Sequence, residues 1–356
     1  MNASVTPIRV TAVSPCRNER GHIQPFLESL LSQDYPADQW ELIVADGMSD
    51  DGTREILREM ESRYAPRLRV IDNPGRIVST GLNAAIRQAR GHYLVRMDCH
   101  TEYAPDFIRR SIEVLEQTGA DNAGGPARTR ARTYMQRAIA AAYHSPFSCG
   151  GASFHNDDFE GYSDTVPYGC WKTARLKELG LFDESLVRNQ DDELNLRITR
   201  AGGKIWQSPK IRSWYYPRPR LGALFRQYFQ YGFWKVAVIR KHRIPASWRH
   251  LIPGAFAAAN VLLLVAAAVF WIGGWPAAGM AFTGTLIVMD GCYLAVSLLA
   301  SLLTARRGGW NLLPVLPLIF AIYHVSYGTG FLTGLFYWFR RSKTAGATDA
   351  FAGLTR

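Results

Sequence analysis

Several familiar signatures are missing from this sequence. It has no G-x-G-x-x-G dinucleotide fingerprint after its first apolar run and no G-x-x-x-x-G-K-[ST] phosphate loop. Its 5 cysteines are an odd number and include no C-x-x-C pair, which argues against a disulfide framework and a zinc site. The cysteine pattern therefore predicts a reduced, cytosolic setting. Any nucleotide site in this chain would differ from the dinucleotide fingerprint and from the phosphate loop.

Charge is scarce in the C-terminal part of the chain. From Leu251 onward there are 6 of the 41 Lys and Arg residues and 2 of the 30 Asp and Glu residues. Residues 1–250 are polar and mildly basic, which suits binding to an anionic lipid surface or to an anionic substrate. Its basic residues are interspersed with acidic ones, so we expect no nucleic acid partner. No basic-then-apolar leader opens the chain, so we expect the first domain to stay cytosolic.

Three apolar runs follow Leu251, at Ile252–Ile272, 277–303 and 312–339, and each is long enough to cross a bilayer. The third contains prolines and could be broken or re-entrant. Three crossings would place the basic residues 340–343 outside, against the positive-inside tendency. The sequence therefore predicts two to three transmembrane helices.

Strands alternate with helices in the first hundred residues, which predicts βαβ units and a parallel sheet. We expect strands at 8–13, 41–45, 68–71 and 93–97, and helices at 23–31, 53–63 and 79–89.

Carboxylates follow several of these strands, where open α/β sheets bind ligands. Glu19, Asp46 and Asp98 would repel one another at one sheet edge unless a cation or hydroxyl donors joined them. A ribose and a metal-bound diphosphate would supply both. The alternative is that such acids are helix caps and turn residues, as we expect of Asp50 and Asp51.

Asp98 and His100 end the fourth strand. Successive side chains alternate on an extended chain, so these two should point the same way. Two potential metal ligands at this position predict a site for a cation and a diphosphate.

Asp191 falls at a predicted helix start, where the helix dipole stabilises a carboxylate. An ionised Asp191 could accept a proton from a hydroxyl group. On the same helix, Glu193 and Arg197 are spaced as an i,i+4 ion pair. The alternative is that Asp191 is only an acidic cap.

Together these motifs resemble the family 2 inverting glycosyltransferases, which have the GT-A fold, and the membrane-anchored subgroup typified by succinoglycan biosynthesis glucosyltransferases. The resemblance covers residues 8 to about 240. The matching segments, in the family's order, are 15–19 (PCRNE), 45–53 (ADGMSDDGT), 73–83, 98–100 (DCH) and 190–193 (QDDE).

The resemblance implies a role for each segment. Asp46 matches the acid that reads uracil, while Gly47 replaces the family's usual second Asp. His100 takes the metal-ligand place in the D-x-D position beside Asp98, so the cation would be Mn²⁺ or Mg²⁺. Asp191 matches the catalytic base. The implied donor-binding residues are Pro15, Arg17, Glu19, Asp46, Arg76, Asn83 and Asp98.

On the acceptor side we expect Gly169, Trp171, Asp192, Glu193 and Trp234. The Q-x-x-R-W motif of the processive synthases has no match at residues 230–234 (QYGFW). We therefore expect single addition of a sugar, as a hexosyltransferase would perform it, to a polyprenyl-linked saccharide in exopolysaccharide or cell-surface glycan synthesis. One alternative is a polyprenyl-phosphate glycosyltransferase that charges the bare lipid phosphate. Another is a nucleotide-sugar-binding membrane scaffold without turnover.

These expectations give a domain plan. Residues 1–218 form a GT-A domain, an α/β unit with a mostly parallel sheet. Residues 219–250 form an amphipathic interfacial helix and linker, with a core helix as the alternative. Residues 251–340 form the transmembrane helices, and 341–356 a flexible tail. The protein would be a multi-pass protein of the inner (plasma) membrane with its catalytic domain in the cytosol.

Overall fold

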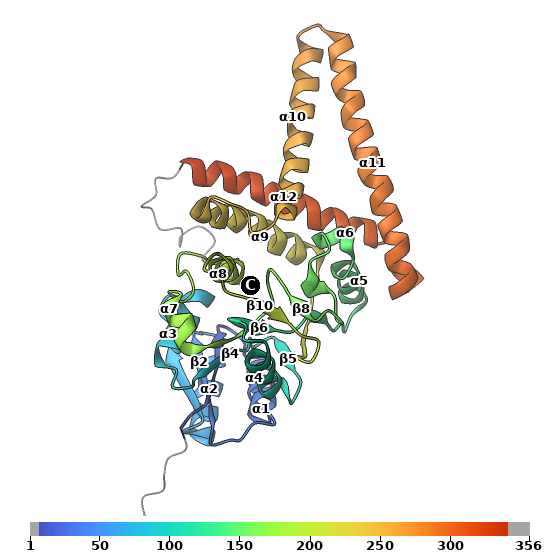
Figure 1. Cartoon of the computed structure of the whole chain (residues 1–356). Helices are drawn as coiled ribbons and strands as arrows, with labels where there is room; N and C mark the ends of the chain where they lie inside the picture. Colours follow the sequence, from blue (N-terminus) through green and yellow to red (C-terminus); the bar gives the residue numbers. More distant parts are fainter. Residues whose placement is uncertain (1–6, 341–356) are drawn as a thin grey trace, which may run out of the picture. The chain divides into compact units, whose positions relative to one another are not determined.

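The computed structural model describes residues 7–340, and the chain divides into two compact units (Figure 1). The sheet unit contains residues 7–129 and 153–216, and the helical unit contains residues 130–152 and 217–340. Residues 130–152, which we had assigned to the first domain, therefore group with the apolar C-terminal helices. The predicted tail at 341–356 lies outside the described residues.

The sheet unit is built on an eight-stranded sheet with the order β3-β2-β1-β4-β9-β6-β10-β8. β1 pairs in parallel with β2 and β4, and β2 pairs in parallel with β3, which confirms the predicted parallel sheet. A smaller sheet has the order β5-β11-β7. The strands are β1 (Val10–Cys16), β2 (Trp40–Asp46), β3 (Leu68–Asp72), β4 (Tyr93–Arg96), β5 (Thr101–Tyr103), β6 (Asn122–Gly124), β7 (Arg128–Thr129), β8 (Gly161–Tyr162), β9 (Cys170–Lys172), β10 (Ile205–Gln207) and β11 (Ser213–Tyr215).

Alternating side chains of the central strands fill two cores. Ala12 and Leu42 belong to one core with α1 and α4, while Val13 and Ile43 belong to the other with α3 and α8. The strands are buried on both faces, which explains their continuous apolar runs. The helices of this unit are α1 (Ile23–Leu31), α2 (Thr53–Tyr64), α3 (Val78–Gln88), α4 (Phe107–Thr118), α7 (Thr173–Glu178) and α8 (Gln190–Arg200), with the 3-10 turn η1 (Ser153–His155).

β9 runs antiparallel between β4 and β6, and it fixes the end of β4. The backbone N–H of Arg96 donates to the carbonyl of Gly169 at 3.1 Å, just before β9. Gly169 has a φ of +101°, and a Cβ there would lie 2.5 Å from the Trp171 ring. Only glycine fits this position, so its role is to let the chain turn beside the end of β4.

The helical unit contains three helices that are long and apolar enough to cross a membrane, α10, α11 and α12. α10 and α11 form a hairpin in which few residues are buried, whereas 44% of the apolar window of α12 is buried (Figure 1). The helices of this unit are α5 (Tyr134–Tyr143), α6 (Pro146–Cys149), α9 (Leu221–His242), α10 (Ile252–Ile272), α11 (Pro276–Gly308) and α12 (Leu316–Arg340), with the 3-10 turns η2 (Trp248–His250) and η3 (Trp310–Leu312).

The aromatic residues of α9 pack on α12. The ring of Phe233, which we expected among lipid headgroups, is buried and lies 5.2 Å from the ring of Tyr337. Trp234, predicted on the acceptor side, is also buried, with its ring 5.7 Å from that of Trp338. This part of α9 is therefore the inner face of a helix pair.

Candidate active site

One buried guanidinium joins the two carboxylates to which we assigned chemistry. Arg96, the last residue of β4, donates from Nε and Nη2 to the two carboxylate oxygens of Asp98 at 2.8 and 2.9 Å. Its Nη1 donates to Oδ1 of Asp191, in the first turn of α8. Only 5% of the Arg96 side chain is exposed. The fold thus brings together two acids that lie far apart in the sequence, through a residue that the motifs did not indicate.

The two carboxylates are in different electrostatic states. Partial burial of the Asp191 carboxylate raises its pKa above the ordinary value, helped by the nearby charges of Asp98 and Asp192, although the charge of Arg96 opposes this shift. Burial alone would also raise the pKa of Asp98, but its ion pair with Arg96 lowers it overall. For Asp191 the shift is opposite to the one we expected from the helix dipole. A raised pKa suits a proton acceptor, because a base works best when its pKa approaches the operating pH.

Asp191 has a free oxygen for that purpose. Its side chain is 39% exposed, and no described residue donates a hydrogen bond to Oδ2. Arg96 therefore holds one oxygen of this carboxylate and leaves the other available.

Asp98 and His100 lie in a turn rather than on an extended strand. β4 ends at Arg96, and the N–H of Thr101 donates to the carbonyl of Asp98 at 3.2 Å. Asp98 is buried and His100 is exposed, with its ring 6.5 Å from that of Tyr215. Our reason for placing the two side chains together, alternation along a strand, was therefore wrong. A metal role for His100 stays a prediction.

Asp46 ends β2 at the same sheet edge, fully buried. It accepts hydrogen bonds from Oγ of Ser49 at 2.5 Å and from Nε of Arg54 at 2.8 Å. Nη2 of Arg54 also pairs with Asp72, at the end of β3. Both oxygens of Asp46 thus have a donor, so a ligand that reads Asp46 must share it with Arg54. The sequence reasoning did not single out Arg54 or Asp72.

The turn after β1 lies beside this cluster. Arg17 packs over Gly47, where a Cβ would come within 3.1 Å of the Cβ of Arg17. The glycine that replaces the family's second Asp therefore makes room for the Arg17 side chain. Pro15 lies on β1, where its carbonyl faces Sγ of Cys99 at 3.5 Å, and Glu19 is buried with its N–H donating to Oγ1 of Thr53 at 2.8 Å.

Two predicted donor-binding residues are placed differently. Asn83 is buried on α3, where its amide donates to the carbonyl of Phe182 and to Glu184, both at 2.8 Å, and accepts from the N–H of Phe182. These bonds use its polar groups to hold residues 182–184. Arg76 is exposed and has a φ of +60° in the turn before α3.

Comparison with known proteins decides the family. A model described as "Glycosyl transferase family 2" matches residues 11–173. The succinoglycan biosynthesis protein ExoA of Rhizobium meliloti (strain 1021) is 35% identical over 276 residues, which cover 76% of this chain and 83% of that protein. The chain belongs to glycosyltransferase family 2. This membership confirms the predicted family and makes the protein a glycosyltransferase.

Two further similar proteins extend the likeness. A protein of Methanococcus voltae named dolichyl N-acetyl-alpha-D-glucosaminyl phosphate 3-beta-D-2,3-diacetamido-2,3-dideoxy-beta-D-glucuronosyltransferase is 26% identical over 333 residues, which cover 92% of this chain and 97% of that protein. The mannosyltransferase PcManGT of Pyrobaculum calidifontis, solved with GDP-Man and Mn²⁺, matches with a TM-score of 0.58 at 20% identity and covers 95% of this chain and 91% of that one. The structural likeness confirms the GT-A fold.

The predicted acceptor-side residues of this family 2 enzyme divide into two groups. Asp192, beside Asp191, is partly exposed. Glu193 is buried and pairs with Arg197 at 2.8 Å, as its spacing predicted, and Arg197 in turn donates to the carbonyls of Leu179 and Leu181. Trp171 is buried in the core that contains α3 and α8. Glu193 and Trp171 therefore support the frame of the site.

A cation would depend on its substrate for further ligands. Within residues 7–340, no group of three or more His, Cys, Asp or Glu side chains is arranged to hold a metal ion. Asp98 and His100 offer one carboxylate and one imidazole, and a divalent cation in such sites takes its remaining ligands from substrate phosphates and water. The donor set fits a cation that arrives with a nucleoside diphosphate.

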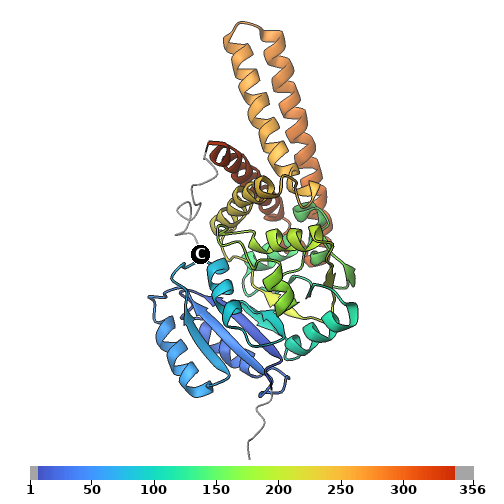
Figure 2. The same cartoon turned by 60° about the vertical axis from the view of Figure 1, so that its left-hand side comes forward.

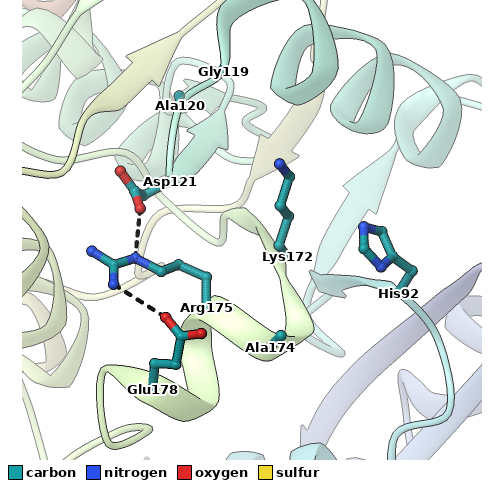
Figure 3. A pocket seen from close by; sticks show the side chains of 8 residues that line it. All are labelled: His92, Gly119, Ala120, Asp121, Lys172, Ala174, Arg175 and Glu178. Carbon is teal, nitrogen blue, oxygen red and sulfur yellow. Dashed lines mark hydrogen bonds and ion pairs between the residues drawn. The ribbon is translucent and has the colours of Figure 1, made fainter.

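A cavity of about 270 Å³ lies beside the start of β4 (Figure 3). Asp98 follows the other end of this strand. It is lined by His92, directly before β4, and by Lys172, which pairs with the first residue of β4. Arg175 in its wall is matched by Asp121 and Glu178. This cavity contains none of the residues that we assigned to the reaction, and we give it no part in catalysis.

Proposed function

We propose that this enzyme transfers a sugar, with inversion, from a nucleotide-sugar to a lipid-linked saccharide. The observation that carries the proposal is the bridge from Asp98 through Arg96 to Asp191. It joins the carboxylate that resembles the family's donor-binding acid to the one that resembles its base. One guanidinium can then set the spacing between the donor's diphosphate and the acceptor's hydroxyl.

The chemistry follows from that arrangement. Oδ2 of Asp191 accepts the proton of the acceptor hydroxyl as its oxygen attacks C1 of the donor sugar. The bond from C1 to the diphosphate oxygen breaks on the opposite face, so a single displacement inverts the anomeric centre. No second nucleophilic carboxylate is needed. A divalent cation, when bound with the donor, would neutralise the charge that develops on the leaving diphosphate. Asp98 and His100 are the residues that would hold it.

The donor end is assigned to the cluster at the ends of β1 and β2. Asp46 and Arg17 would contact the nucleoside, and the family's use of the matching acid favours uridine over other bases. Each oxygen of Asp46 already accepts from Ser49 or Arg54, so the base would share this carboxylate with them.

The acceptor is proposed to be a polyprenyl-linked saccharide at the cytosolic face of the inner (plasma) membrane, in exopolysaccharide or other cell-surface glycan synthesis. Membrane-length helices and the names of the two relatives, which refer to succinoglycan biosynthesis and to a dolichyl phosphate-linked sugar, support this choice.

A transfer assay with the purified full-length protein tests the proposal. Radiolabelled UDP-sugars, with GDP-sugars for comparison, are offered with either a polyprenyl-diphosphate-linked saccharide or the bare polyprenyl phosphate. We expect label to enter only the saccharide-bearing lipid, from a UDP-sugar, with inverted configuration. Labelling of the bare lipid phosphate would support the first alternative. Binding of UDP without release of UDP from any donor would support the scaffold.

Changing His100 tests the cation site. His100→Ala is expected to raise the Mn²⁺ concentration needed for half-maximal transfer at least tenfold, because an imidazole ligand is lost. His100→Asp is expected to retain transfer and to shift the preference toward Mg²⁺, which favours oxygen ligands. Initial rates in metal titrations measure both. His92→Ala, at the other end of β4, is the matched control. If His100→Ala had the same metal requirement as the wild type, His100 would not be a metal ligand.

A further inference from the structure

α12 has the length of a membrane span but not the surroundings of one. Three glycines at its contact with α9 leave no room for side chains. A Cβ on Gly330 would lie 2.1 Å from the carbonyl oxygen of Phe229, and one on Gly232 would lie 2.0 Å from that of Tyr327. Gly334, four residues after Gly330, approaches the carbonyl of Phe233 in the same way. Such spacing of small residues lets two helix backbones pack tightly along their length.

The partner helix α9 is not a span. It carries Arg226 and Lys235 within its length and ends in Arg240, Lys241 and His242. Nη1 of Arg240 donates to the carbonyl of Trp338 at 2.7 Å, which ties the ends of α9 and α12 together. Charged residues of this kind are costly in a bilayer core. A helix that lies beside α9 along its whole length lies at the depth of α9.

The first half of α12 rests on α5 and α6. Oη of Tyr323 donates to the carbonyl of Ile139 at 3.3 Å, and Nε2 of His324 bonds to the carbonyl of Phe147 at 2.8 Å. Along the chain, α5 and α6 stand between β7 and η1, with no membrane-length helix in between. These supports therefore cannot be inside a bilayer either.

α12 crosses the base of the α10–α11 hairpin and does not run along it (Figures 1 and 2). The middle of α12 contacts Pro253 and Gly254 in the first turn of α10. A Cβ on Gly328 of α12 would meet the carbonyl of Pro253, and a Cβ on Gly254 would meet the ring of Phe331 of α12. At the other end of the hairpin the contacts join α10 to α11, as in the stacked rings of Phe270 and Phe282.

One stripe of α12 remains exposed and apolar. Its large members are Leu318, Val325, Phe336 and Phe339. Their spacing of seven, eleven and three residues keeps them near one helix face, opposite the face on α9. An apolar stripe on a helix at headgroup depth fits the boundary between headgroups and hydrocarbon.

We propose that α12 lies in the membrane surface, and that only α10 and α11 cross. The hairpin returns Arg306 and Arg307 to the side on which α10 begins, and α12 keeps Arg340 on that side. This resolves the conflict with the positive-inside rule that three crossings create. The inference does not depend on the proposed reaction.

Accessibility of introduced cysteines in sealed cells tests the sidedness. The full chain carries Cys149→Ser and Cys292→Ser, and its remaining cysteines, Cys16, Cys99 and Cys170, are buried. Arg340→Cys, next to the apolar stripe, and Trp275→Cys, between α10 and α11, place thiols at exposed positions. Glu59→Cys on α2 is the reference, because no candidate membrane span lies between α2 and α10. Arg340→Cys should match Glu59→Cys and react with an impermeant maleimide only after permeabilisation, while Trp275→Cys reacts without it. Labelling of Arg340→Cys in sealed cells would overturn the proposal.

Depth measurements test the orientation independently. Spin labels at Leu318, Val325 and Phe336 in reconstituted bilayers should have the same depth to within a few ångströms, from relative accessibility to oxygen and to a nickel chelate. In a crossing helix, a rise of about 1.5 Å per residue would separate Val325 from the other two by roughly 10 and 16 Å along the helix. Depths that differ by such amounts would show that α12 crosses.

Discussion

Replacing Asp191 by asparagine is expected to lower sugar transfer by about 10²–10⁴-fold, the range that general base catalysis contributes. The amide keeps the size of the side chain and can still accept from Arg96 through its oxygen, but it cannot take up a proton. UDP binding should change little, because the residues that we propose for the donor lie at the ends of β1, β2 and β4. Initial transfer rates and calorimetric UDP binding measure the two effects.

Asp34→Asn is the matched control, since it removes an aspartate carboxylate that is also paired with an arginine, Arg109, outside the assigned site. It should retain most of the activity. If Asp191→Asn transferred sugar at the wild-type rate, Asp191 would not be the catalytic base, and another group would have to accept the proton.

The pH profile of Asp191→Asn carries a second signal. The base works when it is deprotonated, so the wild-type kcat/KM should fall as pH falls through the pKa of Asp191. Because burial raises that pKa, the fall should begin above the range of an ordinary aspartate, which titrates near pH 4. The residual activity of the variant should lack this acid limb.

Local patterns were sufficient for the elements that carry the donor end. The helix Ile23–Leu31 and the parallel strands β1 to β4 follow from apolar periodicity, which depends only on near neighbours in sequence. Placement of acids at strand ends followed from the same reasoning. In contrast, β9 enters the sheet between β4 and β6 in antiparallel sense, and its pairing partners are distant in sequence. No local pattern specifies such a pairing.

The turn at Asp98 shows where periodicity misled. Apolar residues continue to Met97, so their periodicity predicts a strand that reaches the acid, but the chain turns after Arg96. The hydropathy of α12 is compatible with a third crossing, and composition cannot tell a helix buried against α9 from one buried in lipid. Our proposal that α12 does not cross therefore rests on its tertiary contacts, which the sequence pattern does not contain.

Arg96 is the residue that the sequence reasoning missed, although a signal was present. It is the only charged residue in an otherwise apolar strand, Tyr93–Arg96, and a buried arginine requires a partner. That requirement points to nearby acids, of which Asp98 is two residues away. The second partner, Asp191, could not be found this way, because α8 reaches the strand end only through the fold.

Replacing Arg96 by methionine is expected to reduce transfer at least 100-fold. The change leaves two neighbouring carboxylates, one of them only 12% exposed, without their shared cation. Arg96→Lys should not restore activity, because an ammonium group cannot supply two parallel hydrogen bonds to Asp98 and a third to Asp191. Steady-state kinetics should show a loss in kcat and a rise in the KM for the donor.

Two measurements separate this positioning role from a loss of fold. Removing the guanidinium should raise the pKa of Asp191 further, so the acid limb of the residual activity should move to higher pH. Arg175→Met, which breaks ion pairs to Asp121 and Glu178 at the other end of β4, is the matched control and should keep wild-type transfer.

A double-mutant cycle then identifies the path of the effect. If Arg96 acts mainly through Asp191, then adding Arg96→Met to Asp191→Asn should cost far less than it does in the wild-type enzyme. If the two losses multiply instead, Arg96 acts on the donor through Asp98, and the donor KM should carry the additional loss. An Arg96→Met enzyme that folds and retains wild-type kcat, KM and pH profile would contradict both paths, and the bridge would then be a feature of the fold alone.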